Sequence, residues 1–181
     1  VMHFPIARSA DGVSIDECWR AVGMRNTGSH TAIFKDVFVP EEAIGLKRPR
    51  GAYHPVWDVI LTVALPLIMS AYVGVAEAAA NLVKGSVQSR PKNHKLDGHL
   101  PYLFGEMENS LITAQVMHKN MVALANDFEF TPSVNLASDI LSQKSVVAKA
   151  VTDTTTKAIE ASGGFGYLRL SPIERFFRDS F

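Results

Sequence analysis

The stretch from Val59 to Ala76 constrains the fold more than any other part of the sequence, because none of its eighteen residues carries a charge. Its length would suit a membrane span. Pro66 and Gly74 interrupt it, however, and no basic residues anchor its ends. A helix that is apolar on all sides is typical of the centre of a bundle that also contacts neighbouring subunits. We therefore expect a helical bundle rather than a membrane segment, with a bend at Pro66.

Apolar residues at three- to four-residue steps indicate two further helices, over Pro101–Phe128 and from about Ser133 to Ser162. The expected buried residues are Leu103, Met107, Leu111, Ala114, Met121 and Ala125 in the first, and Leu136, Ile140, Val147, Val151 and Ala158 in the second. Another helix begins at Pro172, where Ser171 can cap it and Glu174 can complete a capping box. Four helices with short connections predict an antiparallel four-helix bundle, so the fold class is mainly α.

The first part of the chain shows strand signals instead. Val1–Phe4 and Val13–Ile15 flank a turn at Ala10–Gly12, which predicts a hairpin, and Thr31–Val39 is rich in β-branched and aromatic residues. The short strands need other elements to cover them, because a few strands alone are marginally stable.

A basic segment, Lys47–Gly51, is rich in residues that break regular structure and indicates a solvated linker. We therefore divide the chain into residues 1–45, the end of a β-domain, and residues 46–181, a helical domain.

Composition excludes several classes of protein. Lys plus Arg and Asp plus Glu each total 18, so the net charge is zero and a nucleic-acid partner is not indicated. The one cysteine, Cys18, cannot form an internal disulfide, which favours a reducing, cytoplasmic location, and we expect it to be a buried small residue. The six histidines lack metal-ligand spacing, and no Gly-x-Ser-x-Gly motif supports a serine hydrolase, so neither type of site is predicted.

Two motifs resemble one known family. Gly163-Gly164-x-Gly166-Tyr167, followed by Pro172–Arg175 and the pair Arg178–Asp179, resembles the start of the last long helix of acyl-CoA dehydrogenases. The segment Gly23–Glu41 looks like the end of that family's middle β-domain. Both motifs stand in the family's order, so the resemblance covers nearly the whole chain.

The resemblance implies the C-terminal portion of an FAD-dependent oxidoreductase that removes a proton and a hydride from an acyl-CoA thioester, as in fatty acid metabolism. It also implies a homo-oligomer, a dimer or a homotetramer, in which one subunit's helical domain contacts its neighbour's FAD diphosphate. Arg90 matches the family's diphosphate-binding Arg, Gly163, Gly164 and Gly166 match its glycine turn, and Glu160 stands where the family has Gln. The electron acceptor is not identified.

Other positions depart from the family. Some members carry their catalytic base where this chain has Ala64, with an Arg where it has Leu65. Most others place the base as a Glu soon after the Arg-Asp pair, whereas this sequence stops at Phe181 in its last helix, so we read it as a truncated fragment. We therefore name no catalytic residue. We expect copies of this 181-residue chain to associate with one another. We expect the chain neither to hold FAD tightly nor to oxidise acyl-CoA.

Two other hypotheses remain open. The first is a flavin-dependent monooxygenase of the same fold, which a missing Glu after Asp179 would favour. The second is a non-catalytic helical interaction module, which retention of flavin by the full-length protein would contradict.

Overall fold

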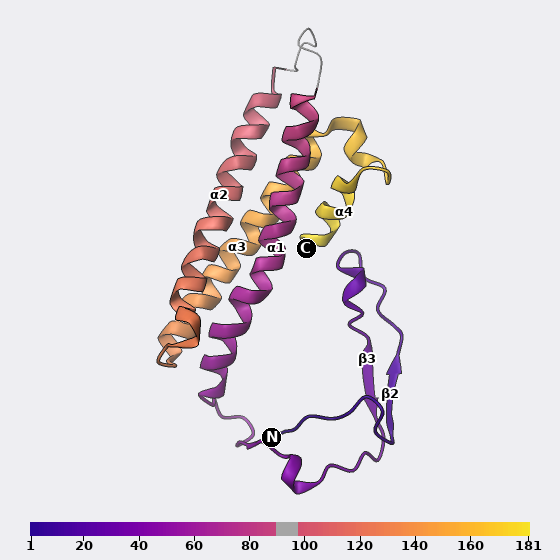
Figure 1. Ribbon diagram of the computed structural model, residues 1–181, viewed down its shortest axis with the longest axis vertical. Helices are drawn as coiled ribbons and strands as arrows, with labels where there is room; N and C mark the ends of the chain where they lie inside the picture. Colours follow the sequence, from indigo (N-terminus) through magenta and orange to yellow (C-terminus); the bar gives the residue numbers. More distant parts are fainter. Residues whose placement is uncertain (90–97) are drawn as a thin grey trace. The chain divides into compact units, whose positions relative to one another are not determined.

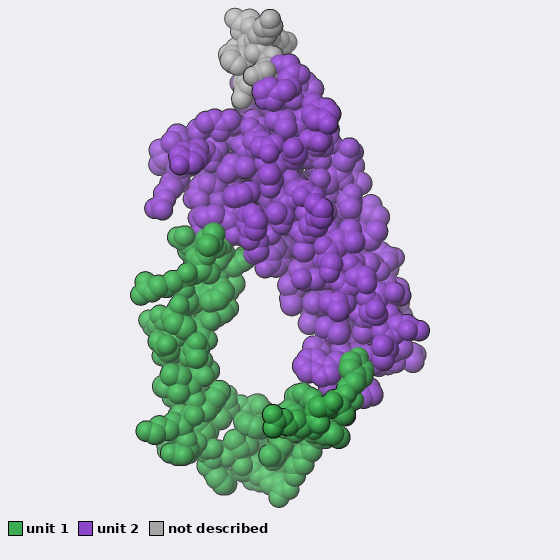
Figure 2. Space-filling model, turned by 180° about the vertical axis from the view of Figure 1, so that it is seen from behind, with its two compact units in different colours: residues 1–54 green, residues 55–181 purple. Residues whose placement is uncertain are grey.

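The computed structural model describes residues 1–89 and 98–181. It contains two compact units, Val1–His54 and Pro55–Phe181, which Figure 2 shows in different colours. Arg90 lies outside the described residues. The expected boundary between a β-domain and a helical domain after residue 45 stays a prediction.

The second unit is a bundle of long antiparallel helices, as Figure 1 shows. The helices are α1 (Val56–Gln88), α2 (Leu100–Ala125), α3 (Val134–Ala161) and the short α4 (Pro172–Asp179). α1, α2 and α3 pack against one another, and α4 packs on α1 and α3. The prediction of a mainly α protein with four helices and a few preceding strands is confirmed.

α1 continues through Pro66 as one helix of 33 residues. Pro66 has no N–H to donate to the carbonyl one turn earlier. Its own carbonyl accepts from the Ser70 hydroxyl at 3.0 Å and lies 3.1 Å from Nε2 of His118 on α2, which links the two helices at this point. By length and composition α1 could cross a membrane, but the core helix of a bundle passes the same test.

The core lies between α1, α2 and α3. Met69, Val73 and Ala76 contribute from α1. Eight of the eleven residues expected to be buried on the other two helices are buried, which supports the helical periodicity: Met107, Leu111, Ala114, Met121, Ile140, Val147, Val151 and Ala158. Leu103, Ala125 and Leu136 are only partly buried. α1 keeps much of its apolar surface in solvent, since 28 % of its most apolar eighteen-residue window is buried and Leu67 and Ile68 are exposed.

α3 and α4 each begin directly after a serine whose side chain caps the helix. The Ser133 hydroxyl accepts from the Leu136 N–H at 3.2 Å at the start of α3. At the start of α4 the Ser171 hydroxyl accepts from the N–H of Ile173 at 3.3 Å. The Glu174 carboxylate binds Arg178, which raises the pKa of that guanidinium.

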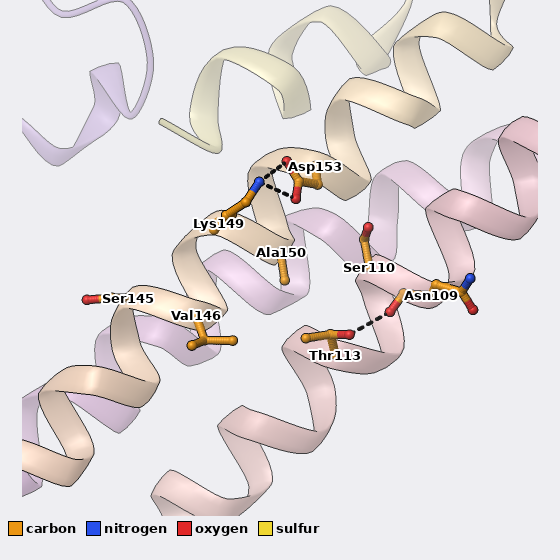
Figure 3. A pocket seen from close by; sticks show the side chains of 8 residues that line it. All are labelled: Asn109, Ser110, Thr113, Ser145, Val146, Lys149, Ala150 and Asp153. Atoms are coloured by element: carbon orange, nitrogen blue, oxygen red, sulfur yellow. Dashed lines mark hydrogen bonds and ion pairs between the residues drawn. The ribbon is translucent and has the colours of Figure 1, made fainter.

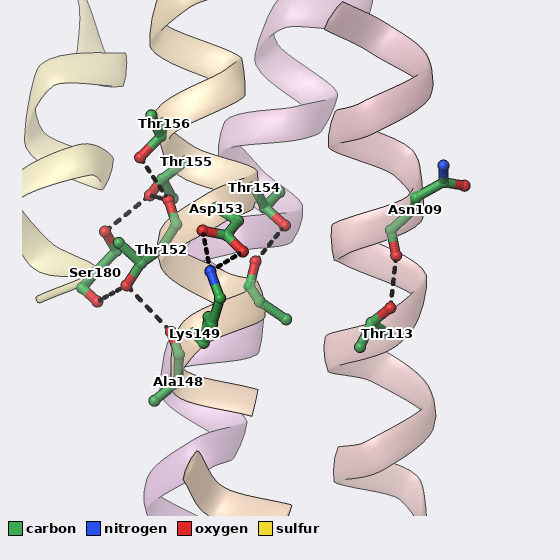
Figure 4. Close-up of polar contacts among 11 residues, drawn as sticks. Asn109, Thr113, Ala148, Lys149, Thr152, Asp153, Thr154, Thr155, Thr156 and Ser180 are labelled. Atoms are coloured by element: carbon green, nitrogen blue, oxygen red, sulfur yellow. Dashed lines mark hydrogen bonds and ion pairs between the residues drawn. The ribbon is translucent and has the colours of Figure 1, made fainter. Parts of the chain in front are cut away.

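The end of α4 is tied to α3 by buried hydroxyl groups, as Figure 4 shows. The hydroxyls of Thr155 and Ser180 lie 2.8 Å apart, and the Thr152 hydroxyl donates to the Ser180 carbonyl at 3.2 Å. Ile173 adds an apolar anchor because it is fully buried in the shared core. α4 is therefore held on the bundle at both ends.

The first unit contains two small antiparallel ladders. β1 (Met2–His3) pairs with β4 (Leu46–Lys47), and β2 (Val13–Asp16) pairs with β3 (Thr31–Phe34). In the second ladder Val13 lies opposite Phe34 and Asp16 opposite Thr31. Single-turn helices η1 (Arg25–Thr27) and η2 (Glu41–Ala43) lie in the loops, and η3 (Asn126–Phe128) and η4 (Gly163–Tyr167) belong to the second unit.

The hairpin expected between Val1–Phe4 and Val13–Ile15 is wrong, because these strands belong to different ladders. Gly12 gives the reason. It has a φ of 82°, and a side chain there would lie 2.1 Å from the Lys35 carbonyl oxygen. Only glycine allows this close backbone approach, and the Lys35 N–H donates to the Gly12 carbonyl at 2.9 Å. The turn therefore guides the chain into β2 beside β3.

Three further expectations change in this unit. The strand expected to run to Val39 ends at Phe34, and Asp36 follows with a φ of 52°. The basic linker begins in β4, where Arg48 exchanges two hydrogen bonds with the backbone of Val1. Cys18 is exposed rather than buried, and its sulfur lies 3.1 Å from the Thr31 hydroxyl.

Candidate functional site

The glycine turn joins the end of α3 to the start of α4. α3 ends at Ala161, and Gly163 then takes a left-handed conformation with a φ of 57°, as a helix-ending glycine commonly does. The η4 turn follows, and the Ser171 N–H donates to the Leu168 carbonyl at 2.9 Å to position the cap of α4. Phe165 and Tyr167 stay largely exposed on this turn.

The three predicted glycines have different reasons to be glycine. A side chain at Gly166 would lie 2.9 Å from the Ile159 carbonyl oxygen, so packing excludes it. Gly163 needs its positive φ. Gly164 has neither reason: its φ is not positive, and a methyl group there would meet nothing within 4 Å. The fold alone does not require glycine at 164, and the backbone there is sterically accessible.

Glu160 stands one turn before these glycines in an ion-pair network. Lys157 binds Glu160 at 3.1 Å and Glu106 of α2 at 3.0 Å. The hydrogen bond that Lys157 donates to Glu106, followed by the one it donates to Glu160, raises the pKa of Lys157 above its ordinary value. The Glu160 side chain is 45 % exposed, so its carboxylate is partly neutralised rather than turned into the core.

The network as a whole carries two negative charges and one positive charge. The carboxyl end of α3 adds further negative potential. Lys157 offsets part of this negative charge, and the backbone of the turn is open to close approach by a ligand.

A cavity of about 230 Å³ lies beside the turn. Leu82 and Val83 of α1 and the ring of Phe165 form its apolar walls. Ser86 and Ser162 also line it, but their hydroxyls donate to carbonyls of their own helices at 2.8 and 2.9 Å. The cavity thus offers a flat aromatic surface and no charged side chain among its described lining residues.

The positions of the family's early base remain apolar. Leu65 is partly buried and packs against the core, next to Ala64 on α1. A methyl and an isobutyl group cannot accept a proton. The part of the chain that the structure describes also contains no group of three His, Cys, Asp or Glu side chains arranged to hold a metal ion.

Sequence reasoning missed Lys157 and Glu106. The three-residue spacing between Lys157 and Glu160 was a usable signal, because such pairs meet on a helix surface. Glu106 belongs to another helix, and no local pattern predicts its approach.

A second surface depression, of about 470 Å³, lies between α2 and α3 (Figure 3). Asn109 and Thr113 line it from α2, and Val146 and Lys149 from α3. The Lys149 ammonium binds both carboxylate oxygens of Asp153, at 3.0 and 2.8 Å. The rim carries both charge signs, but the lining holds no nucleophile beside a base.

Solved structures share this fold. Butyryl-CoA dehydrogenase from Megasphaera elsdenii superposes with a TM-score of 0.81 at 20 % identity, over 99 % of this chain and 46 % of that one. KijD3, solved in complex with FMN and a dTDP-sugar, gives a TM-score of 0.81 at 22 % identity, over 97 % of this chain and 44 % of that one. Identities this low establish the fold alone.

Sequence relatives include an acyl-CoA dehydrogenase and a flavin-dependent monooxygenase subunit. The short-chain-specific acyl-CoA dehydrogenase of Clostridium acetobutylicum is 26 % identical over 183 residues, 99 % of this chain and 46 % of the relative. The oxygenase subunit HsaA of a flavin-dependent monooxygenase from Rhodococcus jostii is 33 % identical over 78 residues, 32 % of this chain and 19 % of the relative.

The chain spans a little under half the length of the curated dehydrogenases that it matches. Residues 67–181 match the family described as acyl-CoA dehydrogenase, C-terminal domain. This match takes in most of α1, the helices α2, α3 and α4, and the glycine turn. The chain therefore belongs to the acyl-CoA dehydrogenase family.

Proposed function

We propose that this chain is the C-terminal portion of an FAD-dependent acyl-CoA dehydrogenase-like oxidoreductase. The observation that carries the proposal is the open backbone at Gly164, in a turn of a C-terminal domain of this family. FAD bound there would accept a hydride from the β carbon of an acyl-CoA thioester, the chemistry that a flavin supplies.

The chain's own residues would position the cofactor rather than move protons. Gly163 and Gly164 let a diphosphate approach the backbone, where a side chain would obstruct it. Lys157 limits the repulsion between that diphosphate and Glu160. The apolar side chains of Ala64 and Leu65 cannot abstract the α proton, so we place the base outside these 181 residues.

Self-association is part of the proposal. α1 exposes Leu67 and Ile68, and the outer faces of α2 and α3 expose Ile112, Val116 and Val146. Exposed apolar area of this kind favours burial against a partner. We propose a homo-oligomer, a tetramer by analogy with the family, in the cytoplasm, where a free thiol such as Cys18 stays reduced.

A glycine comparison in the full-length protein tests the flavin site. Gly164→Ala should leave the thermal unfolding midpoint unchanged, because the added methyl meets open space, yet it should release FAD about tenfold more readily, as absorbance of the purified protein reports. Gly166→Ala is the matched control, and should destabilise the fold itself. Full flavin retention in Gly164→Ala would contradict a cofactor contact at this turn and return the interaction-module hypothesis to first place.

A flavin-dependent monooxygenase is the second candidate. Ala64 and Leu65 favour it, because a monooxygenase needs no carboxylate to abstract an α proton, and the similarity to HsaA agrees. Anaerobic mixing of the full-length protein with acyl-CoA distinguishes the two. Bleaching of the flavin supports the dehydrogenase, whereas no bleaching, together with a protein-dependent oxygenation of an organic substrate by reduced flavin and oxygen, supports the monooxygenase. The codons that follow Phe181 in the parent gene give a second test, since a Glu soon after Asp179 favours the dehydrogenase.

A further inference from the structure

We propose that α1 contains a hinge at Pro66 and that His118 of α2 holds this hinge closed. The residues before it, Val56–Leu65, would then open while the rest of α1 stays packed in the bundle. This device goes beyond the proposed function, because it concerns how α1 moves and names no ligand. It places the point of movement inside the helical unit rather than at the boundary between the two units after His54.

The backbone of α1 is weakest at Pro66. A proline inside a helix has no N–H to donate to the carbonyl one turn earlier, which here belongs to Thr62, and its ring crowds that carbonyl. Such positions are the usual sites of bends in long helices. The residues on the two sides of Pro66 are therefore joined by one hydrogen bond fewer than those elsewhere in the helix.

The two parts of α1 also differ in how they are buried. After Pro66 the helix contributes buried apolar residues along its length, namely Met69, Val73, Ala76, Ala79, Ala80 and Val83. Before it, the buried residues are Asp58 and Thr62, and the Thr62 hydroxyl donates to the Asp58 carbonyl of the same helix at 2.7 Å. Among the described residues, Val56–Leu65 adds only the partly buried Leu65 to the apolar core. Opening this part of α1 therefore exposes little of that core.

His118 closes the hinge from the neighbouring helix. Its Nε2 lies 3.1 Å from the Pro66 carbonyl oxygen and 2.9 Å from the hydroxyl of Ser70, which itself donates to that carbonyl at 3.0 Å. A carbonyl oxygen can only accept, so Nε2 carries the hydrogen and shares it between the two oxygens. Because α1 and α2 run side by side (Figure 1), this contact fixes the first turn after Pro66 to α2.

This contact determines where the opening stops. Pro66 and Ser70 stay tied to α2 through His118 when the preceding turns open, so the opening does not spread along α1. Loss of the His118 N–H would move its end toward Met69, the first core residue of α1. We therefore expect amide protection to rise sharply at Pro66, whereas an ordinary helix end frays gradually.

Amide hydrogen exchange, measured by NMR on the 181-residue chain, tests the hinge. After correction for intrinsic rates, the amides of Leu61–Leu65 should exchange about tenfold faster than those of Met69–Val73. Pro66→Ala restores the missing N–H and should reduce this ratio about fivefold, as expected for one hydrogen bond. Pro101→Ala is the matched control and should leave it unchanged, because Pro101 stands in the first turn of α2, where an N–H has no helical partner.

Variants of His118 test the contact that holds the hinge closed. His118→Leu should speed exchange of Leu67–Ser70 about fivefold, whereas His118→Gln keeps an N–H donor and should retain wild-type rates. The amides of Val147–Val151 on α3 report the stability of the whole bundle and should not change. Protection that does not rise sharply at Pro66, or a rise that survives in Pro66→Ala, overturns the hinge. Equal rates in the two His118 variants, or an equal change over Val147–Val151, overturn the role of His118.

Discussion

The two units of this chain differ in how far their secondary structure is supported by a core. In Val1–His54 no residue is buried, and the strands are two to four residues long. In Pro55–Phe181 the long helices enclose a continuous apolar core that includes Met107, Met121 and Ile140. Both units have regular backbone hydrogen bonds, but only the second removes apolar surface from water.

The comparison teaches that the strand unit depends on something outside itself. Phe34, Phe38 and Val22 are 56, 85 and 70 % exposed. Isolated two-stranded ladders are marginally stable in water, and a third layer or a packed helix is needed to support them. The helical unit meets that requirement internally, because its three long helices cover one another. Four experiments sharpen this contrast.

Cutting the chain between His54 and Pro55 should have the largest effect. We expect residues 55–181 to keep their helical circular dichroism and a cooperative thermal transition, since their core is internal. Residues 1–54 should show no cooperative transition. The contrast fails if the strand unit melts cooperatively alone, or if the helical unit loses its helices.

Truncating a buried residue should affect the two units unequally. Ile140 is fully buried, so Ile140→Ala should lower the free energy of unfolding by about 2–5 kcal/mol. Ile15→Ala removes the same atoms from a half-exposed strand residue and should cost less than about 1 kcal/mol. Urea denaturation measures both, followed by helical circular dichroism for Ile140→Ala and by the NMR signals of β2 and β3 for Ile15→Ala. Equal effects would show that the strand unit has a core of its own.

A methyl group added at a tight glycine gives a smaller effect in each unit. Gly166→Ala brings a Cβ to 2.9 Å from the Ile159 carbonyl oxygen and should destabilise the bundle by about 1–3 kcal/mol. Gly12→Ala clashes with Lys35 and should abolish the β2–β3 pairing, seen as lost cross-strand contacts between Val13 and Phe34 in NMR spectra. The unfolding midpoint of the helices should not change in Gly12→Ala; a shift would reveal coupling between the units.

The Lys157 network should give the smallest effect, and only at high pH. The pKa of Lys157 is raised above its ordinary 10.5 by Glu106 and Glu160. A raised folded-state pKa means that the stabilisation is fully present below 10.5 and is lost as the pH rises through the folded value. Lys157→Met should therefore differ from wild type equally at pH 7 and pH 9, and converge with it above the folded-state pKa. A difference that grows with pH would contradict the network.

Many of the buried residues and helix starts of the helical unit can be predicted from the local sequence pattern. Apolar spacing predicts the buried residues Met107, Leu111, Ile140 and Val147, because a helix repeats every 3.6 residues and one face must be covered. Ser133 and Ser171 predict two helix starts for an equally local reason, since a hydroxyl satisfies a backbone N–H only a few residues away.

Which strands pair with each other could be determined only from the tertiary structure. Val1–Phe4 and Val13–Ile15 look like the arms of a hairpin, yet β1 pairs with β4, more than forty residues along the chain. Strand signals report that a segment is extended, but not which segment it will pair with, because pairing depends on distant backbone groups. Gly12 carried the relevant information only through its contact with Lys35.

For the candidate site, the sequence by itself determined the glycine turn, the cap of α4 and the apolar replacements at Ala64 and Leu65. Only the tertiary structure decided which glycine is free of packing and that Glu160 shares Lys157 with Glu106. The physical reason is the distance along the sequence over which each kind of interaction acts. Backbone conformation and capping are set by neighbours in sequence, whereas steric room and charge pairing are set by whichever side chains the packed helices bring together.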